Sequence, residues 1–175
     1  MKGIYTLIIF LAEKTLIRTR KKNFIVPRGF CIYVGSAMGP YTKSLEKRVL
    51  RHLRKHKTRF WHIDYLLKKK AAGIKAILYS PSMKKLECSL ASQFEKRRSV
   101  WVPIDGFGCS DCKCRGHLFV ALGKTNLESA LKNAMKAHRK VGLSPRMILI
   151  GRGKSPFQLF FFQMPNEEAG STGKI

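Results

Sequence analysis

Two apolar segments, each carrying a tyrosine close to a glycine, constrain the fold of this chain more than any other feature. Gly3-Ile4-Tyr5 opens the first segment, over residues 4–11, and Tyr33-Val34-Gly35 ends the second, over residues 30–35. Both are rich in β-branched and aromatic residues, which favours strands. If the two strands pair, the phenols of Tyr5 and Tyr33 can lie side by side on one face of a sheet.

The rest of the pattern predicts strands and helices around this pair. Apolar runs bounded by turn residues indicate further strands over residues 16–18, 74–79, 117–122, 147–150 and 159–162. Apolar residues at helical spacing indicate helices over residues 43–55, 61–67, 82–97 and 126–142. Thr42, Ser82 and Asn126 are the predicted N-caps of the three longer helices. The predicted fold class is α/β of the α+β type, a small, mainly antiparallel sheet flanked by helices.

Glu87 occupies an unusual position in the predicted helix over residues 82–97. The apolar stripe of this helix is formed by Met83, Leu86, Leu90 and Phe94, and Glu87 lies four residues after Met83 and three before Leu90. We therefore predict that its carboxylate faces inward with the apolar side. An inward carboxylate is costly to keep charged unless a cation stabilises it.

Two further polar residues, His62 and Asp64, lie in the predicted short helix over residues 61–67. Both could join a functional site. The helix also contains Trp, Ile, Tyr and Leu, and we favour a role in which it packs these side chains into the core.

Length and composition favour a single domain. With 175 residues, of which 45% are hydrophobic, the chain can bury a core of its own. We expect residues 1–125 to form the core and residues 126–165 to extend the same domain with a helix and strands. Residues 166–175 are predicted to be a disordered tail.

The charge of the chain points to a polyanionic partner. The formal net charge is +25 and the isoelectric point is near 10.4. Cations that neutralise phosphates release condensed counterions, so nucleic acid is the first candidate, DNA before RNA, and an anionic membrane surface is the second. A generally basic proteome would explain the charge without such a partner. The residues predicted to contact a nucleic-acid backbone are Lys43, Lys47, Arg51, Arg54, Lys55, Lys57 and Arg59.

We expect a cytoplasmic protein with no membrane partner. The apolar run over residues 4–11 is far shorter than the roughly 20 residues of a membrane span, and it lacks the features of a signal peptide. The five cysteines are an odd number without an export signal, which indicates a reducing compartment and mostly free thiols. The sequence does not indicate an oligomeric state.

Five residues together have the chemistry that phosphodiester hydrolysis requires. This reaction needs a positioned water, a group that takes its proton, a cation near the developing charge and usually a metal. Tyr5 and Tyr33 can orient or deprotonate the water. Arg48 can bind the phosphate, and His52 can shuttle a proton. Glu87 can supply a carboxylate oxygen to Mg²⁺ or Mn²⁺, although each residue taken singly has an ordinary structural explanation.

The order of these residues resembles the GIY-YIG nuclease superfamily. Gly3-Ile4-Tyr5 and Tyr33-Val34-Gly35 are similar to its two signature segments, and a helix with arginine and a later helix with glutamate follow in the same order. The resemblance implies a GIY-YIG-like fold with Tyr5 and Tyr33 as the signature tyrosines. It implies that Arg48 is the helix arginine and that His52 is the residue one turn later. Glu87 would be the single metal-binding carboxylate.

A closer resemblance is to a mostly archaeal group of small members, related to excision-repair and intron-encoded endonucleases. It rests on residues 33–37, 48–52, 61–67 and 106–112. Ser36 departs from the superfamily pattern, since many members carry a basic residue there. Ser99 lies near the position where many carry an asparagine.

These features predict a metal-dependent endonuclease of structured or single-stranded nucleic acid, acting in DNA repair or nucleic-acid processing. The alternative is a non-catalytic, basic nucleic-acid-binding protein on the same scaffold. Such a binder would need the basic face but not Tyr5, Arg48 and Glu87 together, and their joint presence favours the enzyme.

A loop rich in cysteine could carry a separate function. Cys109, Cys112, Cys114 and His117 form the pattern Cys-x₂-Cys-x-Cys-x₂-His, whose soft ligands suggest Zn²⁺. The spacing between Cys112 and Cys114 is tighter than in most zinc sites, and no second, remote pair exists. We therefore favour a packed loop over a zinc site or a redox module.

Overall fold

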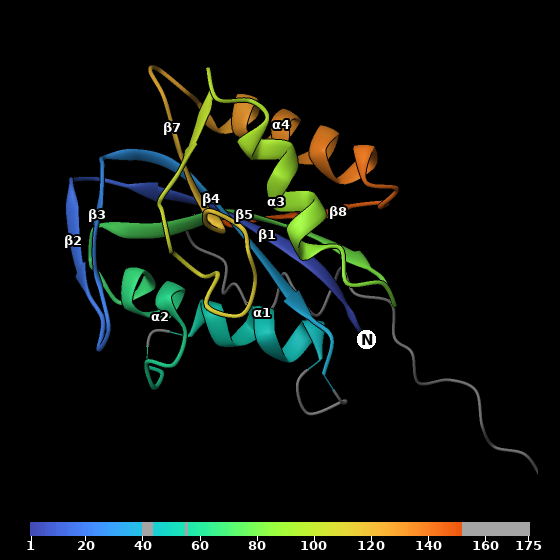
Figure 1. Cartoon of the computed structure of the whole chain (residues 1–175), viewed down its shortest axis with the longest axis horizontal. Helices are drawn as coiled ribbons and strands as arrows, with labels where there is room; N and C mark the ends of the chain where they lie inside the picture. The colour runs from blue at the N-terminus through green and yellow to red at the C-terminus, as the bar shows by residue number, and fades with distance from the viewer. Residues whose placement is uncertain (40–43, 55, 152–175) are drawn as a thin grey trace, which may run out of the picture.

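The computed structural model describes residues 1–39, 44–54 and 56–151. Within them, a six-stranded antiparallel sheet has the strand order β6-β7-β4-β1-β5-β8 (Figure 1). Its strands are β1 (Gly3–Leu11), β4 (Gly29–Ala37), β5 (Ala72–Pro81), β6 (Trp101–Pro103), β7 (Leu118–Ala121) and β8 (Arg146–Leu149). A separate hairpin consists of β2 (Thr15–Arg18) and β3 (Asn23–Val26).

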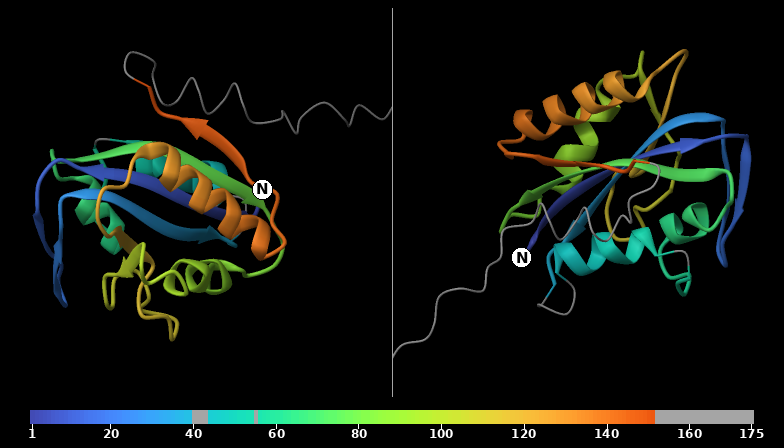
Figure 2. Two further views of the ribbon diagram at one scale, coloured as in Figure 1. Left: turned by 90° about the horizontal axis from the view of Figure 1, so that it is seen from above. Right: turned by 180° about the vertical axis from the view of Figure 1, so that it is seen from behind.

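Helices cover both faces of the six-stranded sheet. On one face lie α1 (Leu45–Leu53) and α2 (His62–Leu67), and on the other lie α3 (Glu87–Glu95) and α4 (Leu127–Lys140) (Figures 1 and 2). The predicted α+β class, with a mainly antiparallel sheet and flanking helices, is confirmed.

The central strand β1 supplies both layers of the core. Tyr5, Leu7 and Ile9 belong to the apolar cluster on the side of α1 and α2, whereas Ile4 and Ile8 belong to the cluster on the side of α3 and α4. This alternation follows from the pleat of a strand, which points successive side chains to opposite faces. Burying one aliphatic side chain stabilises a fold by about 1.5–3 kcal/mol, so a strand buried on both faces anchors the whole molecule.

The helix predicted over residues 43–55 is α1, and it starts later than expected. Ser44 is its N-cap, and the side chain accepts a hydrogen bond from the Lys47 backbone N–H at 3.5 Å. Ser44 thus holds the capping position predicted for Thr42, which lies outside the described residues. Leu45 and Val49 are buried and seat the helix on the sheet.

The helix predicted over residues 82–97 is α3, and here the prediction was wrong at the start. The chain continues as β5 to Pro81, and the Ser82 backbone N–H donates to the Lys2 carbonyl at 3.1 Å. The Ser82 hydroxyl then bonds to both the backbone N–H and the carbonyl of Lys84, each at 3.1 Å, and this local turn takes the place of a first helical turn. Helix α3 begins at Glu87. Met83 therefore lies outside the helix and is 77% exposed, although it was predicted to join the apolar stripe.

Helix α4 packs closely on the sheet through small residues. Asn126 caps it as predicted, since its side chain accepts from the Ser129 backbone N–H at 2.8 Å. Ala130 and Ala134 are fully buried and let the helix approach the strands. The buried His138 bonds from this helix to the hydroxyls of Thr6 and Ser80, on two strands, at 2.9 and 2.8 Å. β8 then pairs with β5 at the edge of the sheet.

Some predictions fall on parts of the chain that the structure does not describe. They are the strand over residues 159–162, the tail over residues 166–175, and the contact residues Lys43 and Lys55. In the described part of the chain, no helix combines the length and the apolar character that a bilayer span requires.

Candidate active site and cysteine cluster

Tyr5 and Tyr33 lie side by side on the sheet face that α1 and α2 cover. β1 and β4 pair so that Tyr5 is opposite Gly35 and Leu7 is opposite Tyr33. This register places the two phenols diagonally on one face, with ring centroids 6.4 Å apart. The expectation that the strands pair and bring the tyrosines together is confirmed.

Helix α1 brings Arg48 and His52 to these tyrosines. The two residues are four positions apart; His52 is buried together with Leu45 and Val49, and Arg48 is half-buried beside them. The Tyr5 hydroxyl and His52 Nε2 form a hydrogen bond of 2.8 Å. The Arg48 guanidinium stacks on the ring of Trp61, with Cζ 4.3 Å from the ring centroid. This stack fixes the direction of the arginine, because a guanidinium over an indole face gains a cation–π interaction.

Asp64 lies behind His52 and is completely buried. Its Oδ2 accepts hydrogen bonds from Arg51 at 2.9 Å and from the backbone N–H groups of Phe60 and Trp61 at 3.1 and 3.0 Å. The other oxygen, Oδ1, faces His52 Nδ1 at 3.8 Å. Within the described residues, neither of these two atoms has a hydrogen-bond partner. Tyr5, His52 and Asp64 therefore form a row of polar groups. A small movement that shortens the 3.8 Å distance between His52 and Asp64 would make it a continuous chain of hydrogen bonds.

Sequence reasoning assigned the helix with His62 and Asp64 to the core, and only part of that interpretation holds. His62 does have a packing role, since its Nδ1 accepts from the Gly108 backbone N–H at 3.0 Å and its ring lies against Phe24 and Phe107. Asp64 is different, because it points to a histidine of the site. The available signal was a carboxylate inside an apolar helix, which is rarely buried without a partner.

Burial keeps the phenols protonated and the imidazole neutral. Desolvation raises the pKa of Tyr5 and that of Tyr33 well above the usual value for a phenol. The charge of Arg48 acts against this rise and the charge of Glu87 adds to it. Desolvation also lowers the pKa of His52 well below its usual value, and nearby cations lower it further. At neutral pH, the protonated Tyr5 hydroxyl can therefore donate its hydrogen bond to the neutral imidazole of His52.

Glu87 reaches the site from the start of α3. Its side chain accepts a hydrogen bond from the Ser36 hydroxyl on β4, and its Oε1 pairs with His117 Nδ1 at 3.1 Å. The carboxylate remains 27% exposed, so it is not sealed in the core. The predicted inward direction is correct, but Glu87 faces the polar groups of Ser36 and His117 rather than an apolar environment.

The predicted backbone-contacting cations divide into two groups. Arg51 and Lys57 hold residues of the candidate site in place. Arg51 binds Asp64, and Lys57 donates to the His52 carbonyl at 2.7 Å, where burial lowers the pKa of the lysine to about 8. Lys47, Arg54 and Arg59 are exposed, and the Arg59 guanidinium lies 5.2 Å from the centroid of the Tyr65 ring.

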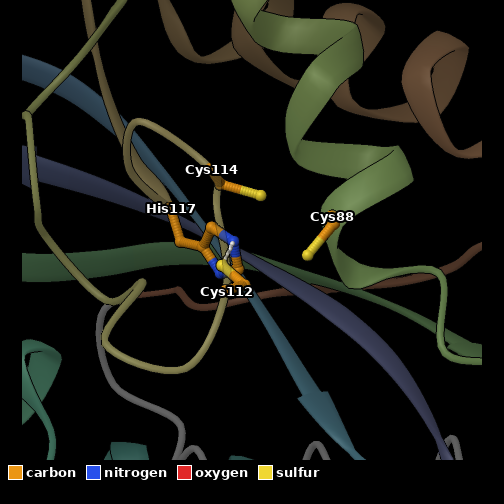
Figure 3. Close-up of side chains that lie close together, drawn as sticks. All are labelled: Cys88, Cys112, Cys114 and His117. Atoms are coloured by element: carbon orange, nitrogen blue, oxygen red, sulfur yellow. Dashed lines mark hydrogen bonds between the residues drawn. The ribbon is translucent and has the colours of Figure 1, made fainter.

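The cysteine loop forms a cluster different from the predicted one. Cys112, Cys114 and His117 come together with Cys88 of α3, and their ligand atoms all lie within 4.8 Å of one another (Figure 3). Cys109 does not join them, because its thiol donates to the Arg115 carbonyl at 3.6 Å. Burial, and then the adjacent Cys88 and Cys112, raise the pKa of Cys114. No sequence spacing could indicate Cys88, which packing alone brings from 24 residues away.

Comparisons with known proteins identify a family but no activity. No curated protein and no solved structure matches this chain. Residues 4–140 match a family described as Domain of unknown function DUF123. They run from the second residue of β1 to the end of α4 and include every residue of the candidate active site and of the cysteine cluster. The match covers well over half of the sequence. The chain belongs to the DUF123 family.

Proposed function

We propose that this protein is a metal-dependent endonuclease of the GIY-YIG type that cleaves structured or single-stranded nucleic acid, DNA before RNA. The observation that carries the proposal is the contact between Tyr5 and His52 at 2.8 Å, beside Tyr33 and within the influence of two opposite charges. Those charges are Arg48 and Glu87, which both act on the two phenols. The residues come from β1, β4, α1 and α3, so their meeting is a property of the fold.

The proton path follows from the polar chain. An attacking water gives a proton to the Tyr5 oxygen as the Tyr5 hydroxyl proton passes to His52 Nε2. The imidazolium formed in this way lies 3.8 Å from the free oxygen of Asp64, whose negative charge favours it. Catalytic hydrogen bonds are often long before substrate binds, so closure of this gap is part of the proposed mechanism. Asp64 is thus a positioning residue for His52.

In this proposal, Tyr33 and Arg48 contact the attacking water and the substrate phosphate. The Tyr33 phenol, protonated because of burial, orients the water next to Tyr5. Arg48, held against Trp61, offers fixed donors to a phosphate oxygen. A preorganised donor of this kind is typically worth about 2.7–4 kcal/mol in the transition state.

Glu87 fits a Mg²⁺ or Mn²⁺ site with one protein carboxylate. Mg²⁺ keeps several waters and takes phosphate oxygens as ligands, so it does not require an all-protein cage. Glu87 is partly exposed and retains lone pairs beyond those used by Ser36 and His117. The bound ion would neutralise negative charge on the phosphate. The strong positive charge of the chain supports binding of the nucleic-acid backbone.

One observation supports the alternative of a non-catalytic binding protein. Both partners of Glu87 are protein groups, which would be sufficient for a purely structural carboxylate. In that case the basic surface would bind nucleic acid, and no cleavage would depend on Glu87.

The test is cleavage of labelled single-stranded, duplex, flapped and abasic DNA, with matching RNA, across a Mg²⁺ titration. We expect Mg²⁺-dependent cleavage that falls at least about a hundredfold in Glu87→Gln, while binding and thermal stability persist. Glu95→Gln is the matched control, because Glu95 lies eight residues later on the same helix. Cleavage by Glu87→Gln at the wild-type rate, or no cleavage by the wild type, would leave only the binding function.

A further inference from the structure

Four soft ligand atoms converge where the start of α3 meets the loop between β6 and β7. They are the sulfurs of Cys88, Cys112 and Cys114 and one ring nitrogen of His117, all within 4.8 Å of one another. Figure 3 shows Cys88 on the helix, with its sulfur directed to the other three residues, which the loop supplies. We propose that this cluster binds one structural zinc ion, as a Cys₃His site that ties the loop to α3.

The distances are close to those of a filled site. With Zn–S near 2.3 Å and Zn–N near 2.05 Å, a tetrahedron has sulfur–sulfur edges of about 3.8 Å and sulfur–nitrogen edges of about 3.6 Å. The distance between Cys112 Sγ and His117 Nε2 is 3.5 Å. The upper limit of 4.8 Å for the set exceeds the expected edges by about 1 Å. Small side-chain rotations are enough to close that difference.

The second nitrogen of His117 supports a metal-binding role. Nδ1 pairs with Glu87 Oε1 at 3.1 Å, so this nitrogen carries the proton and Nε2 keeps its lone pair as an acceptor or metal ligand. Nε2 is the nitrogen that faces Cys112. A carboxylate that accepts from the other ring nitrogen is the usual outer partner of a zinc-bound histidine, because it fixes the tautomer and the ring orientation.

The loop is held in place before any metal binds. At its base, the backbone N–H of Ile104 donates to the Leu118 carbonyl at 2.8 Å. The backbone N–H of His117 donates to the Phe107 carbonyl at 2.7 Å. Arg115 adds two hydrogen bonds to the Asp105 carboxylate, each of 3.1 Å. A loop that is fixed at both ends loses little further entropy when it binds an ion.

The donor set selects zinc and a closed site. Thiolates and imidazole favour Zn²⁺ over the hard cations that carboxylates bind, and four protein ligands leave no open position for substrate. The ion would hold Cys88, and therefore the adjacent Glu87, at a fixed distance from the loop. The zinc ligands are different residues from the one proposed to hold Mg²⁺, although Glu87 contacts the zinc-binding His117. The zinc proposal does not depend on nuclease activity.

Metal content of the untagged, full-length chain tests the proposal directly. We expect one zinc per chain by elemental analysis, and less than about a tenth of that in Cys88→Ser and in Cys114→Ser. Cys109→Ser is the matched control, because Cys109 is in the same loop but outside the cluster, and it should keep its zinc. A wild-type chain without zinc, full zinc in Cys88→Ser, or loss of zinc in Cys109→Ser would each overturn the proposal.

Thiol labelling of the wild type provides a second test that needs no variant to fold. Cys31 is buried, so the folded zinc form should label at Cys109 alone, and a chelator should expose Cys88, Cys112 and Cys114 as well. Addition of Co²⁺ to the metal-free chain should then produce thiolate charge-transfer absorption and restore protection. Labelling of all four thiols before chelation would contradict a bound metal. A disulfide among them, visible as a mass lower by two hydrogens, would do so as well.

Discussion

The phenol of Tyr5 occupies the space that a side chain at position 35 would need. A Cβ built on Gly35 would lie 2.4 Å from both the hydroxyl oxygen and Cζ of Tyr5. The two residues are directly opposite each other in β1 and β4, and both are buried. Because position 35 is glycine, the ring of Tyr5 can lie over the backbone of β4, and its hydroxyl can reach His52 at 2.8 Å. The tyrosine of one segment explains the glycine of the other.

Gly35→Ala should displace this phenol. Overpacking of this kind typically costs about 1–3 kcal/mol, and loss of the contact to His52 should also reduce cleavage. Chemical denaturation measures the free energy of unfolding, and a double-mutant cycle with Tyr5→Ala isolates the contact. Gly73→Ala is the control, because a Cβ there would meet only the Lys75 side chain, at 3.9 Å or more. Additive effects at positions 5 and 35 would show that the two residues do not interact.

His52→Gln should separate proton transfer from structure. Glutamine can still accept a hydrogen bond from Tyr5, but it cannot take up the proton, so cleavage should fall about 10²–10⁴-fold with little loss of stability. In the wild type, the pKa of His52 lies well below 6.5, so the neutral imidazole persists at neutral pH. The cleavage rate should therefore stay level from pH 8 to about 6.5 and decline only below that. A decline centred above pH 7 would exclude His52 as the acceptor.

The exposed cations beside α1 and α2 should set the salt dependence of binding. Arg54, Lys68 and Lys70 are exposed on this side, and replacing all three with alanine removes three positive charges. If each contacts a phosphate of duplex DNA, the slope of log affinity against log salt should decrease by about 0.9 per residue. Titrations at several salt concentrations measure this slope.

A matched control for that variant lies on the opposite layer. Lys124, Lys136 and Lys140 are also exposed, in α4 and just before it. Their replacement changes the net charge by the same amount. Because it removes no cation from the side of α1 and α2, it should leave most of the salt dependence of binding intact. Equal effects of the two triple variants would mean that only the total charge matters. The proposal that nucleic acid binds on the side of α1 and α2 would then be incorrect.

His138 should make the protein less stable in weak acid. Burial lowers its pKa from 6.5 to about 4, so the unfolded chain binds the proton more strongly than the folded chain. Stability contributed by this neutral histidine is complete above pH 6.5 and is lost as the pH falls toward 4, by up to about 3 kcal/mol. His138→Gln should remove this part of the pH dependence, measured by denaturation between pH 4 and 7.5. An unchanged pH dependence in that variant would assign the acid sensitivity to other groups, of which His52 is the first candidate.

Several features of the site follow from local sequence alone. The apolar run of β1 and the stripe of Leu45 and Val49 define which faces are buried, because side-chain period and backbone geometry are linked in strands and helices. Together with antiparallel pairing, these periods bring Tyr5 and Tyr33 together and place Arg48 and His52 on the helix above them. For this reason the fold class and the meeting of the tyrosines could be predicted.

Other features depended on contacts between segments that are distant in sequence. The predicted start of α3 was wrong because Ser82 bonds to Lys2 of the neighbouring segment and to Lys84 in a local turn, and helical periodicity contains no information about such bonds. Cys88 replaced Cys109 in the cysteine cluster because α3 packs against the loop, while Cys109 bonds within the loop. Asp64 reached His52 through the packing of α2 beside α1. Sequence period thus determined the faces of single elements, whereas the tertiary structure decided which polar atoms meet, since hydrogen bonds and metal ligands require distances that only packing establishes.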